Sequence, residues 1–281
     1  MDHYSDGDTR VLRRVLLIGG LLMFAHEAMA AAVVPHRAVY DLTLLRSSPA
    51  AAIGAVSGLM AYEVSGSECD GWTVNFRLVN QFDYKEGNSR LIDSQSSSWE
   101  AGDGLTMTYS QKEFIDRKMD SEKRLSVTRA EKGGPGDGVI NLPTVKNFTI
   151  TDETIFPMRH QLRLMEAAEN GASRDTSLVY DGSDEDKAVR AISSIGKRVN
   201  AGESNDDTNN PAAAALAQLP SWPVSIGYYS VDEANAETPI YEISFDMYEN
   251  GVSTGLVMDY GNFALEGRLK NLEIFKEETC K

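Results

Sequence analysis

Two cysteines, Cys69 and Cys280, carry the clearest chemical signal in this sequence of 281 residues. Two thiols allow a single intramolecular pairing, and in an oxidising compartment such a pair persists as a disulfide. A redox-active pair is the alternative, but catalytic dithiols generally lie close together, as in Cys-x-x-Cys. A bridge closing about 210 residues would remove roughly 5 kcal/mol of unfolded-chain entropy as an upper figure. The spacing therefore favours a structural bridge over a redox switch.

Histidine chemistry is restricted to two positions in most of the chain. Of the four histidines, only His36 and His160 follow residue 30. A histidine-based acid or base in that region must be one of these two. Neither belongs to a His-Glu-x-x-His metal motif, and no phosphate-cradling glycine loop is present. We therefore expect no catalytic residues, no cofactor and no metal ligands.

Four carboxylates gather within residues 181–186: Asp181, Asp184, Glu185 and Asp186. Oxygen-rich loops can bind hard cations such as Ca²⁺, but the EF-hand spacing, with its central glycine and distal glutamate, is absent. The segment is better explained as the solvated tip of a hairpin. Nor does the sequence place two carboxylates at the separation that glycoside hydrolysis requires.

Large aromatic side chains form a further group of candidates: Trp72, Trp99, Trp222, Tyr228 and Tyr229. Ordinary packing in a core explains them without a ligand, because aromatic rings bury much apolar area. If a sheet curls around a space instead, the same rings would line a hollow that could hold a lipid.

The first thirty residues predict the cellular compartment of the protein. Arg10, Arg13 and Arg14 precede an apolar run at 15–25, and residues 28–30 read Ala-Met-Ala. This pattern is typical of a cleaved signal peptide, residues 1–30. The run of about eleven apolar residues is shorter than the roughly twenty of a spanning helix, although an uncleaved anchor is the alternative. We expect a periplasmic protein that does not span the membrane after cleavage.

The negative net charge of the chain argues against some classes of binding partner. The full chain has a formal net charge of −15 from 27 basic and 42 acidic residues. Residues 1–30 contain three of the basic and four of the acidic residues, so 24 and 38 remain and the charge becomes −14. An acidic surface repels phosphate backbones and anionic headgroups, which argues against nucleic acid and against direct binding to a lipid surface.

The elements that must position these groups are mostly strands. Apolar and polar residues alternate with a period of two, as in half-buried strands. The clearest runs are residues 38–44, 60–64, 72–78, 105–109, 241–247, 252–260 and 263–274. Asp103-Gly104 and Asn250-Gly251 separate neighbouring runs and predict hairpin turns with positive φ.

One helix interrupts the strands. Pro157 suits a first helical turn, and Asn170-Gly171 supplies a stop. An apolar stripe along this helix should face the sheet. Its members are Met158, Leu162, Met165 and Ala168.

Two segments predict irregular structure. The glycine-rich residues 133–138 are expected to form a flexible loop. The polar insertion near residues 200–219 is expected to be mobile, with a brief helix possible at 212–218. With a single helix and many strands, the chain is predicted to be all-β, one domain over residues 31–281, with an antiparallel sheet that curls or closes on itself.

Several short stretches together resemble one family, the envelope integrity protein B family of alphaproteobacterial periplasmic proteins, formerly a domain of unknown function. The resemblance covers nearly all of residues 31–281. Its motifs are His36-Arg37-Ala38-Val39-Tyr40, Cys69-Asp70-Gly71-Trp72, Phe156-Pro157-Met158-Arg159-His160, Tyr180-Asp181-Gly182-Ser183, Trp222-Pro223-Val224 with Tyr228-Tyr229, Tyr241-Glu242, Asn250-Gly251, Asp259-Tyr260 with Phe263, and the terminal Cys280.

The resemblance implies a β-spiral, an incomplete barrel of antiparallel strands with one main helix. It also implies a disulfide that joins Cys69 to Cys280 and a role in maintaining the cell envelope, with no enzymatic activity to transfer. The insertion before Leu219 is where we expect departure from relatives.

The sequence thus predicts a non-enzymatic periplasmic protein that supports envelope integrity by binding or scaffolding. Its partner would be an envelope protein or a lipid, and the helix with its adjacent loops is the expected contact surface. A first alternative is a carrier of lipid or lipoprotein in the part-closed barrel. Others are an envelope hydrolase that uses His160 or His36, and an outer-membrane barrel.

Overall fold

The computed structural model describes residues 32–184, 186–203, 210–232 and 237–276. Residues 31–281 form one compact unit by their contacts. The predicted signal peptide and Cys280 lie outside the described residues, so cleavage and the disulfide stay predictions.

A single sheet dominates the described chain. Its fifteen strands run in the order β8-β7-β6-β5-β4-β3-β2-β1-β15-β14-β13-β12-β11-β10-β9. Neighbouring strands are antiparallel except β9 and β10, which pair in parallel. The strands are β1 (His36–Ser47), β2 (Ile53–Ser67), β3 (Gly71–Tyr84), β4 (Ser89–Glu100), β5 (Thr106–Ile115), β6 (Lys118–Arg129), β7 (Gly136–Leu142), β8 (Lys146–Ile150), β9 (Thr154–Ile155), β10 (Arg174–Val179), β11 (Val189–Ile195), β12 (Ser221–Ser230), β13 (Tyr241–Tyr248), β14 (Ser253–Asp259) and β15 (Phe263–Ile274).

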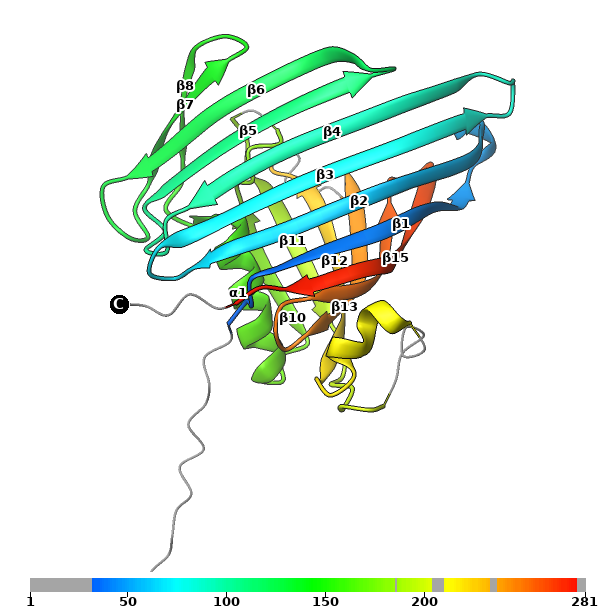
Figure 1. Cartoon of the computed structure of the whole chain (residues 1–281). Helices are drawn as coiled ribbons and strands as arrows, with labels where there is room; N and C mark the ends of the chain where they lie inside the picture. Colours follow the sequence, from blue (N-terminus) through cyan, green and yellow to red (C-terminus); the bar gives the residue numbers. More distant parts are fainter. Residues whose placement is uncertain (1–31, 185, 204–209, 233–236, 277–281) are drawn as a thin grey trace, which may run out of the picture. The chain divides into compact units, whose positions relative to one another are not determined.

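The sheet curls until its two edge strands, β8 and β9, leave one seam. Because these strands follow each other in the sequence, the seam lies where the chain passes from β8 to β9. Figure 1 shows the long strands β2–β6 crossing in front of β11–β13. The predicted curled, nearly closed antiparallel sheet is confirmed.

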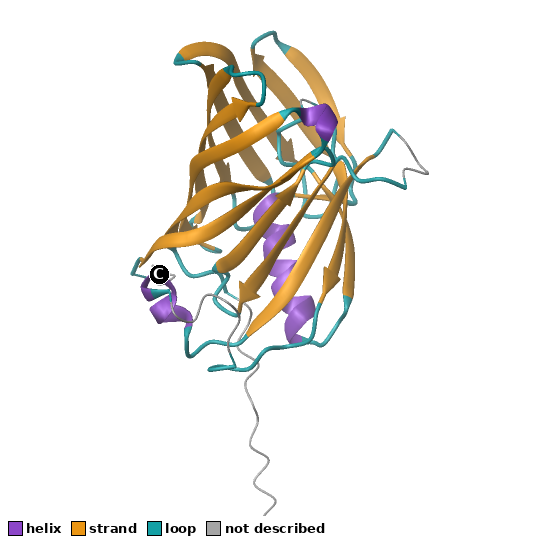
Figure 2. Ribbon diagram, turned by 90° about the vertical axis from the view of Figure 1, so that its right-hand side faces the viewer, coloured by secondary structure: helices purple, strands orange, loops and turns teal. Residues whose placement is uncertain are grey.

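The α-helix α1 (Pro157–Glu169) lies inside this curl (Figure 2). It begins and ends at the predicted residues, and Gly171 has the left-handed φ of +73° expected after a helix end. All four residues of the predicted stripe are buried. They pack in one cluster with Val64 and Trp72 on one side of the barrel and Val224 and Ile226 on the other. The helix therefore joins the two crossing halves of the sheet.

The prediction of a flexible loop at residues 133–138 is wrong for its second half, because β7 begins at Gly136. The glycines of this strand lie close to neighbouring side chains. A Cβ on Gly138 would lie 2.2 Å from the Phe148 ring, which is 9% exposed. A strand that runs under a buried ring needs a residue without a side chain, and this need mimics a loop signal in the sequence.

The insertion near 200–219 also differs in part from expectation. Residues 204–209 lie outside the described residues. The following 3-10 helix, η2 (Pro211–Leu216), matches the brief helix suggested by the alanines. It is packed rather than exposed, since Leu216 is 1% exposed and Asn210 donates a hydrogen bond to the Leu269 carbonyl of β15.

Candidate functional site

The inner face of the sheet and α1 line a cavity of about 300 Å³ that is partly open to solvent. Its lining comes from β1–β3, α1, the residues around β10, and β12–β14. The apolar part of the wall consists of Met60, Phe76, Pro157, Leu164, Val179, Ile226, Ile243, Phe245, Met247 and Leu256. This volume lies at the lower end of the range for small-molecule sites, which are mostly apolar with a few polar groups.

Hydrogen bonds tie the cavity wall together across distant parts of the chain. The Tyr62 hydroxyl donates to Gln161 Oε1 at 3.3 Å, and Gln161 Nε2 donates to the Gly251 carbonyl at 3.0 Å. These bonds link β2, α1 and the β13–β14 turn. The Tyr40 hydroxyl donates to the Ser253 carbonyl at 2.7 Å. The wall is thus held in shape by its own side chains.

Both histidines singled out from the sequence line this one cavity. His36 is 1% exposed and His160 is 5% exposed. Burial lowers the pKa of His36, and it lowers the pKa of His160 to about 4 despite the attraction of Asp175. Both imidazoles are therefore uncharged at neutral pH. The sequence identifies both histidines as candidates, but nothing in it predicts that they line the same cavity.

A buried carboxyl group caps the start of α1, and no local feature of the sequence predicts it. The helix has no side-chain cap of its own at Phe156. Instead the Met158 amide donates to Glu100 of β4, 3.1 Å from each carboxyl oxygen. Burial raises the pKa of Glu100 to about 8, although hydrogen bonds from Met158 and Arg159 oppose the rise. Only the tertiary structure brings the end of β4 to the helix.

The described acidic residues Asp181, Asp184 and Asp186 lie in the connection between the antiparallel strands β10 and β11, where a hairpin was predicted. The Asp181 carboxylate accepts hydrogen bonds from the amide and the hydroxyl of Ser183. Lys146 of β8 pairs with Asp186 at 2.9 Å, and Lys123 of β6 donates to the Ser183 carbonyl. Among the described residues, no group of three or more His, Cys, Asp or Glu side chains could hold a metal ion.

The aromatic candidates divide between core, cavity and surface. Trp72 and Trp222 belong to the core cluster around α1, and Trp99 is 37% exposed. Tyr228 lines the cavity, whereas Tyr229 does not. Tyr228 also begins a row of stacked rings that the sequence did not predict. The row runs from Tyr228 through Tyr241 and Tyr260 to Phe263, with centroid separations of 4.4, 6.3 and 4.9 Å.

One serine motif was missed at the level of sequence. Residues 251–255 match the Gly-x-Ser-x-Gly pattern of hydrolases, and Ser253 lines the cavity. A nucleophile elbow needs a strand followed by a helix. Here the motif spans the turn after β13 and the start of β14, a hairpin. Within the described chain, no hydrogen bond joins Ser253 Oγ to His36 or His160.

Cys69 lies in the β2–β3 turn, and Cys280 lies outside the described residues. The strands that lead to them are close. Ile274 of β15 pairs with His36, which pairs with Val64 of β2. Two strand spacings amount to about 10 Å, and Cys69 lies five residues beyond Val64, about 16 Å along the strand, so the separation is about 19 Å. The six residues from Ile274 to position 280 can reach about 20 Å. This geometry supports the predicted bridge, which no described contact tests.

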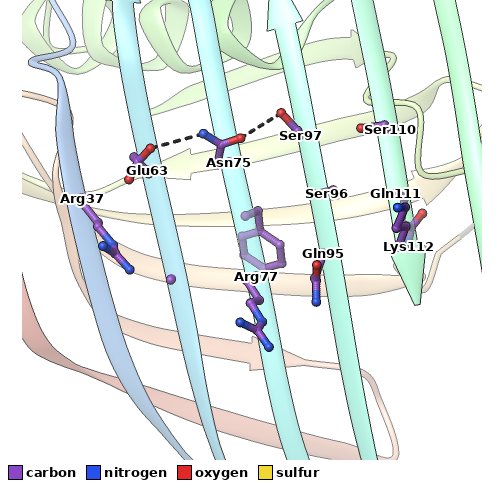
Figure 3. A pocket seen from close by; sticks show the side chains of 12 residues that line it. Arg37, Glu63, Asn75, Arg77, Gln95, Ser96, Ser97, Ser110, Gln111 and Lys112 are labelled. Carbon is purple, nitrogen blue, oxygen red and sulfur yellow. Dashed lines mark hydrogen bonds between the residues drawn. The ribbon is translucent and has the colours of Figure 1, made fainter. Parts of the chain in front are cut away.

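A second hollow, of about 460 Å³, lies on the opposite face of β1–β5 and is polar. In Figure 3, Ser97 donates to Asn75 at 2.8 Å, and Asn75 donates to Glu63 at 3.3 Å. Arg77 makes two hydrogen bonds to Asp93, at 3.0 and 2.8 Å. Because these side chains bond one another across neighbouring strands, the hollow is explained as a solvated sheet surface.

Three comparisons with known proteins identify the same family over most of the chain. The family model described as EipB-like matches residues 27–276. The cell envelope integrity protein EipB of Brucella abortus (strain 2308) is 34% identical over 263 residues, covering 93% of this chain and 91% of that protein. A crystal structure of a beta-barrel-like protein of domain of unknown function DUF1849 from Brucella abortus aligns with a TM-score of 0.80 at 32% identity. That alignment covers 88% of this chain and 100% of the other. In the described part of this chain, no helix is long and apolar enough to cross a membrane.

Proposed function

The chain belongs to the EipB-like family, and on that premise we propose that it supports cell envelope integrity from the periplasm by binding a ligand rather than converting one. The family resemblance noted from the sequence motifs is confirmed. The relative's name, cell envelope integrity protein, supports the envelope role. Periplasmic location rests on the signal-peptide pattern of residues 1–30.

The cavity between α1 and the sheet is the observation that carries this proposal. Its wall is built mainly from apolar side chains on six strands and one helix. Water in such a space makes few hydrogen bonds, so an apolar ligand that replaces it is stabilised by the hydrophobic effect. Among the functions compatible with an envelope role, the cavity favours a carrier or sensor of a lipid-like molecule.

The arrangement of ionisable groups supports binding over catalysis. Asp175 accepts from Arg163 at 2.7 Å and from Ser177 at 2.7 Å, so this carboxylate near His160 is already engaged. Within the described residues, neither histidine has a hydrogen bond to a carboxylate or to a nucleophilic side chain. A triad requires both contacts.

Fluorescence titration with the apolar dye N-phenyl-1-naphthylamine tests the proposal in vitro. Leu164→Trp places a larger side chain in the cavity wall and should abolish dye binding. Glu166→Trp, on the exposed side of the same helix, is the matched control and should bind as the native protein does. Met60→Trp fills the cavity from β2 instead of α1, so it controls for a folding defect specific to the helix. Native affinity in both cavity variants, with native circular dichroism, would refute the cavity as the ligand site.

A cellular test connects the cavity to the envelope. Cells that lack the protein should become sensitive to detergent. The Glu166→Trp variant should restore resistance, and the Leu164→Trp variant should not when both reach the same level in the periplasm. Full restoration by both variants would mean that the envelope role does not use the cavity.

A further inference from the structure

The polar side chains of the cavity wall differ in whether they have partners. Tyr40, Tyr62, Gln161 and Asp181 all make the hydrogen bonds described above. These bonds hold the wall together and leave those groups little need of a ligand. Polar groups that are buried without a partner carry a cost of desolvation, which a ligand can relieve.

His160 has such an unpartnered group. Its Nε2 is buried without a hydrogen bond from any described residue, and the whole residue is 5% exposed. His160 lies in the first turn of α1 and is one of the residues that line the cavity. An apolar side chain at this position would pack without the unsatisfied nitrogen. The imidazole is therefore a candidate for contact with a ligand.

His36 supplies a second nitrogen, whose hydrogen-bonding role can be assigned. Its Nδ1 lies 2.8 Å from the Val34 carbonyl oxygen. A carbonyl oxygen only accepts, so Nδ1 carries the proton and donates. In the uncharged ring Nε2 then has a lone pair and can only accept. No described residue donates to that nitrogen, and His36 lines the same cavity as His160.

From these two nitrogens we infer that the cavity binds an uncharged amphiphile, an apolar chain whose head group carries an O–H or N–H that donates to His36 Nε2 and bonds His160 Nε2. The inference rests on the proposed binding function and adds the class of ligand. The alkyl chain would lie against the apolar wall. A carboxylate lacks a proton to donate, and the Asp181 side chain in the wall would repel it.

Three probes of equal chain length separate the possible head groups: 1-decanol, decyl methyl ether and decanoate. Each is titrated against the bound dye N-phenyl-1-naphthylamine. Decanol donates and accepts a hydrogen bond, the ether only accepts, and decanoate is an anion. We expect decanol to bind about fivefold more tightly than the ether, the usual contribution of one net hydrogen bond. Decanoate should bind more weakly than both.

His36→Phe and His160→Phe remove the nitrogens and keep an aromatic ring. The ratio of ether to decanol dissociation constants should fall to about one in His36→Phe and should decrease in His160→Phe. Ser97→Ala, on the opposite face of the sheet, is the control and should keep the native ratio. Equal affinity for decanol and the ether in the native protein, or tighter binding of decanoate, would overturn the inference.

A measurement on the unchanged protein covers the case in which a variant fails to fold. Only His36 and His160 follow residue 30, so the imidazole ¹⁵N signals of the mature protein are few. Decanol should shift the Nε2 signal of His36, and the ether should not. If all three probes fail to displace the dye, the proposed function itself fails. If decanol and the ether displace it equally and leave Nε2 unshifted, only the ligand class fails.

Discussion

Among single residues, Glu100 connects the end of β4 to the start of α1. Its carboxyl group accepts the Met158 amide, and α1 carries part of the cavity wall. Glu100 is 3% exposed and its pKa is raised to about 8, mainly by burial. At neutral pH the folded protein therefore holds it protonated, and a proton on a buried carboxyl avoids an uncompensated charge next to the helix.

Glu100 makes stability fall with increasing pH. Because the folded pKa of about 8 exceeds the ordinary value of 4.5, the unfolded chain loses this proton first as pH rises. The free energy of unfolding therefore decreases between these two values, by up to about 1.4 kcal/mol per pH unit, and levels off above them. Glu100→Gln keeps an oxygen acceptor for Met158 and should remove this slope.

Urea unfolding of both proteins at pH 5 and pH 8 measures the effect. The variant should gain stability relative to the native protein as pH rises. Subtraction cancels the contributions of His36 and His160, which are the same in both proteins. An equal difference at both pH values would show that Glu100 is ionised in the folded state.

The sequence identifies candidate residues by their type, but it does not predict which of them lie close together in the fold. His36 and His160 stand out because they are the only histidines after residue 30. Their common cavity depends on the register of β1 against β2 and on where α1 packs, and neither is encoded locally. Glu100 looks like an ordinary strand end in the sequence. Its role appears only when β4 meets the helix.

At the scale of elements, α1 and the hairpins follow from local signals. The helix ends were predicted by Pro157 and Asn170-Gly171, and the turn at Asn250-Gly251 has the expected positive φ, +82° at Gly251. Residues 133–138 were misread because glycine serves two purposes. It forms loops, and it also admits a buried ring such as Phe148 over a strand.

Because α1 packs between the two halves of the sheet, we expect Met165→Ala to cause a large loss of stability. Met165 is 1% exposed within the cluster that joins α1 to β12. Removing its side chain should lower the free energy of unfolding by about 2–5 kcal/mol. Glu166→Ala, one position along and exposed, should change it by less than about 0.5 kcal/mol. Chemical denaturation of both variants would contradict the central position of α1 if their effects were similar.

The close packing around Gly138 of β7 predicts that alanine is tolerated less well there than at another glycine of the sheet. A Cβ at Gly138 would meet three Phe148 ring atoms at 2.2 to 2.5 Å, and Phe148 itself packs 5.3 Å from the Tyr180 ring. Gly138→Ala should therefore destabilise by about 1–3 kcal/mol. Gly54→Ala is the control, because its nearest neighbour is 3.4 Å away. Equal melting temperatures for the two variants would show that residues 136–138 are not packed under the ring.

The whole molecule is one sheet whose first and last strands lie side by side. β1 pairs with β15 over eleven positions, from His36 with Ile274 to Ser47 with Phe263. Alternation and a single helix predicted an all-β curl. The strand order, the seam between β8 and β9 and the cavity beside α1 come from pairing between distant segments, which a single sequence does not specify.

The predicted bridge between Cys69 and Cys280 would fasten this closure. The oxidised protein should show no titratable thiol after denaturation without reductant. Cys69→Ser should show one, and it should lose stability by up to about 5 kcal/mol. Reductant should lower the native protein to the stability of that variant. Two titratable thiols in protein taken directly from the periplasm would rule the bridge out.

Native mass spectrometry of the protein released from the periplasm by osmotic shock, without detergent, tests the binding function most directly. We predict a bound species of lipid-like mass that is uncharged in its head group, present on the native protein and on Glu166→Trp and absent from Leu164→Trp. A polypeptide mass alone for the native protein, or the same adduct on the variant with the filled cavity, would contradict a ligand site between α1 and the sheet.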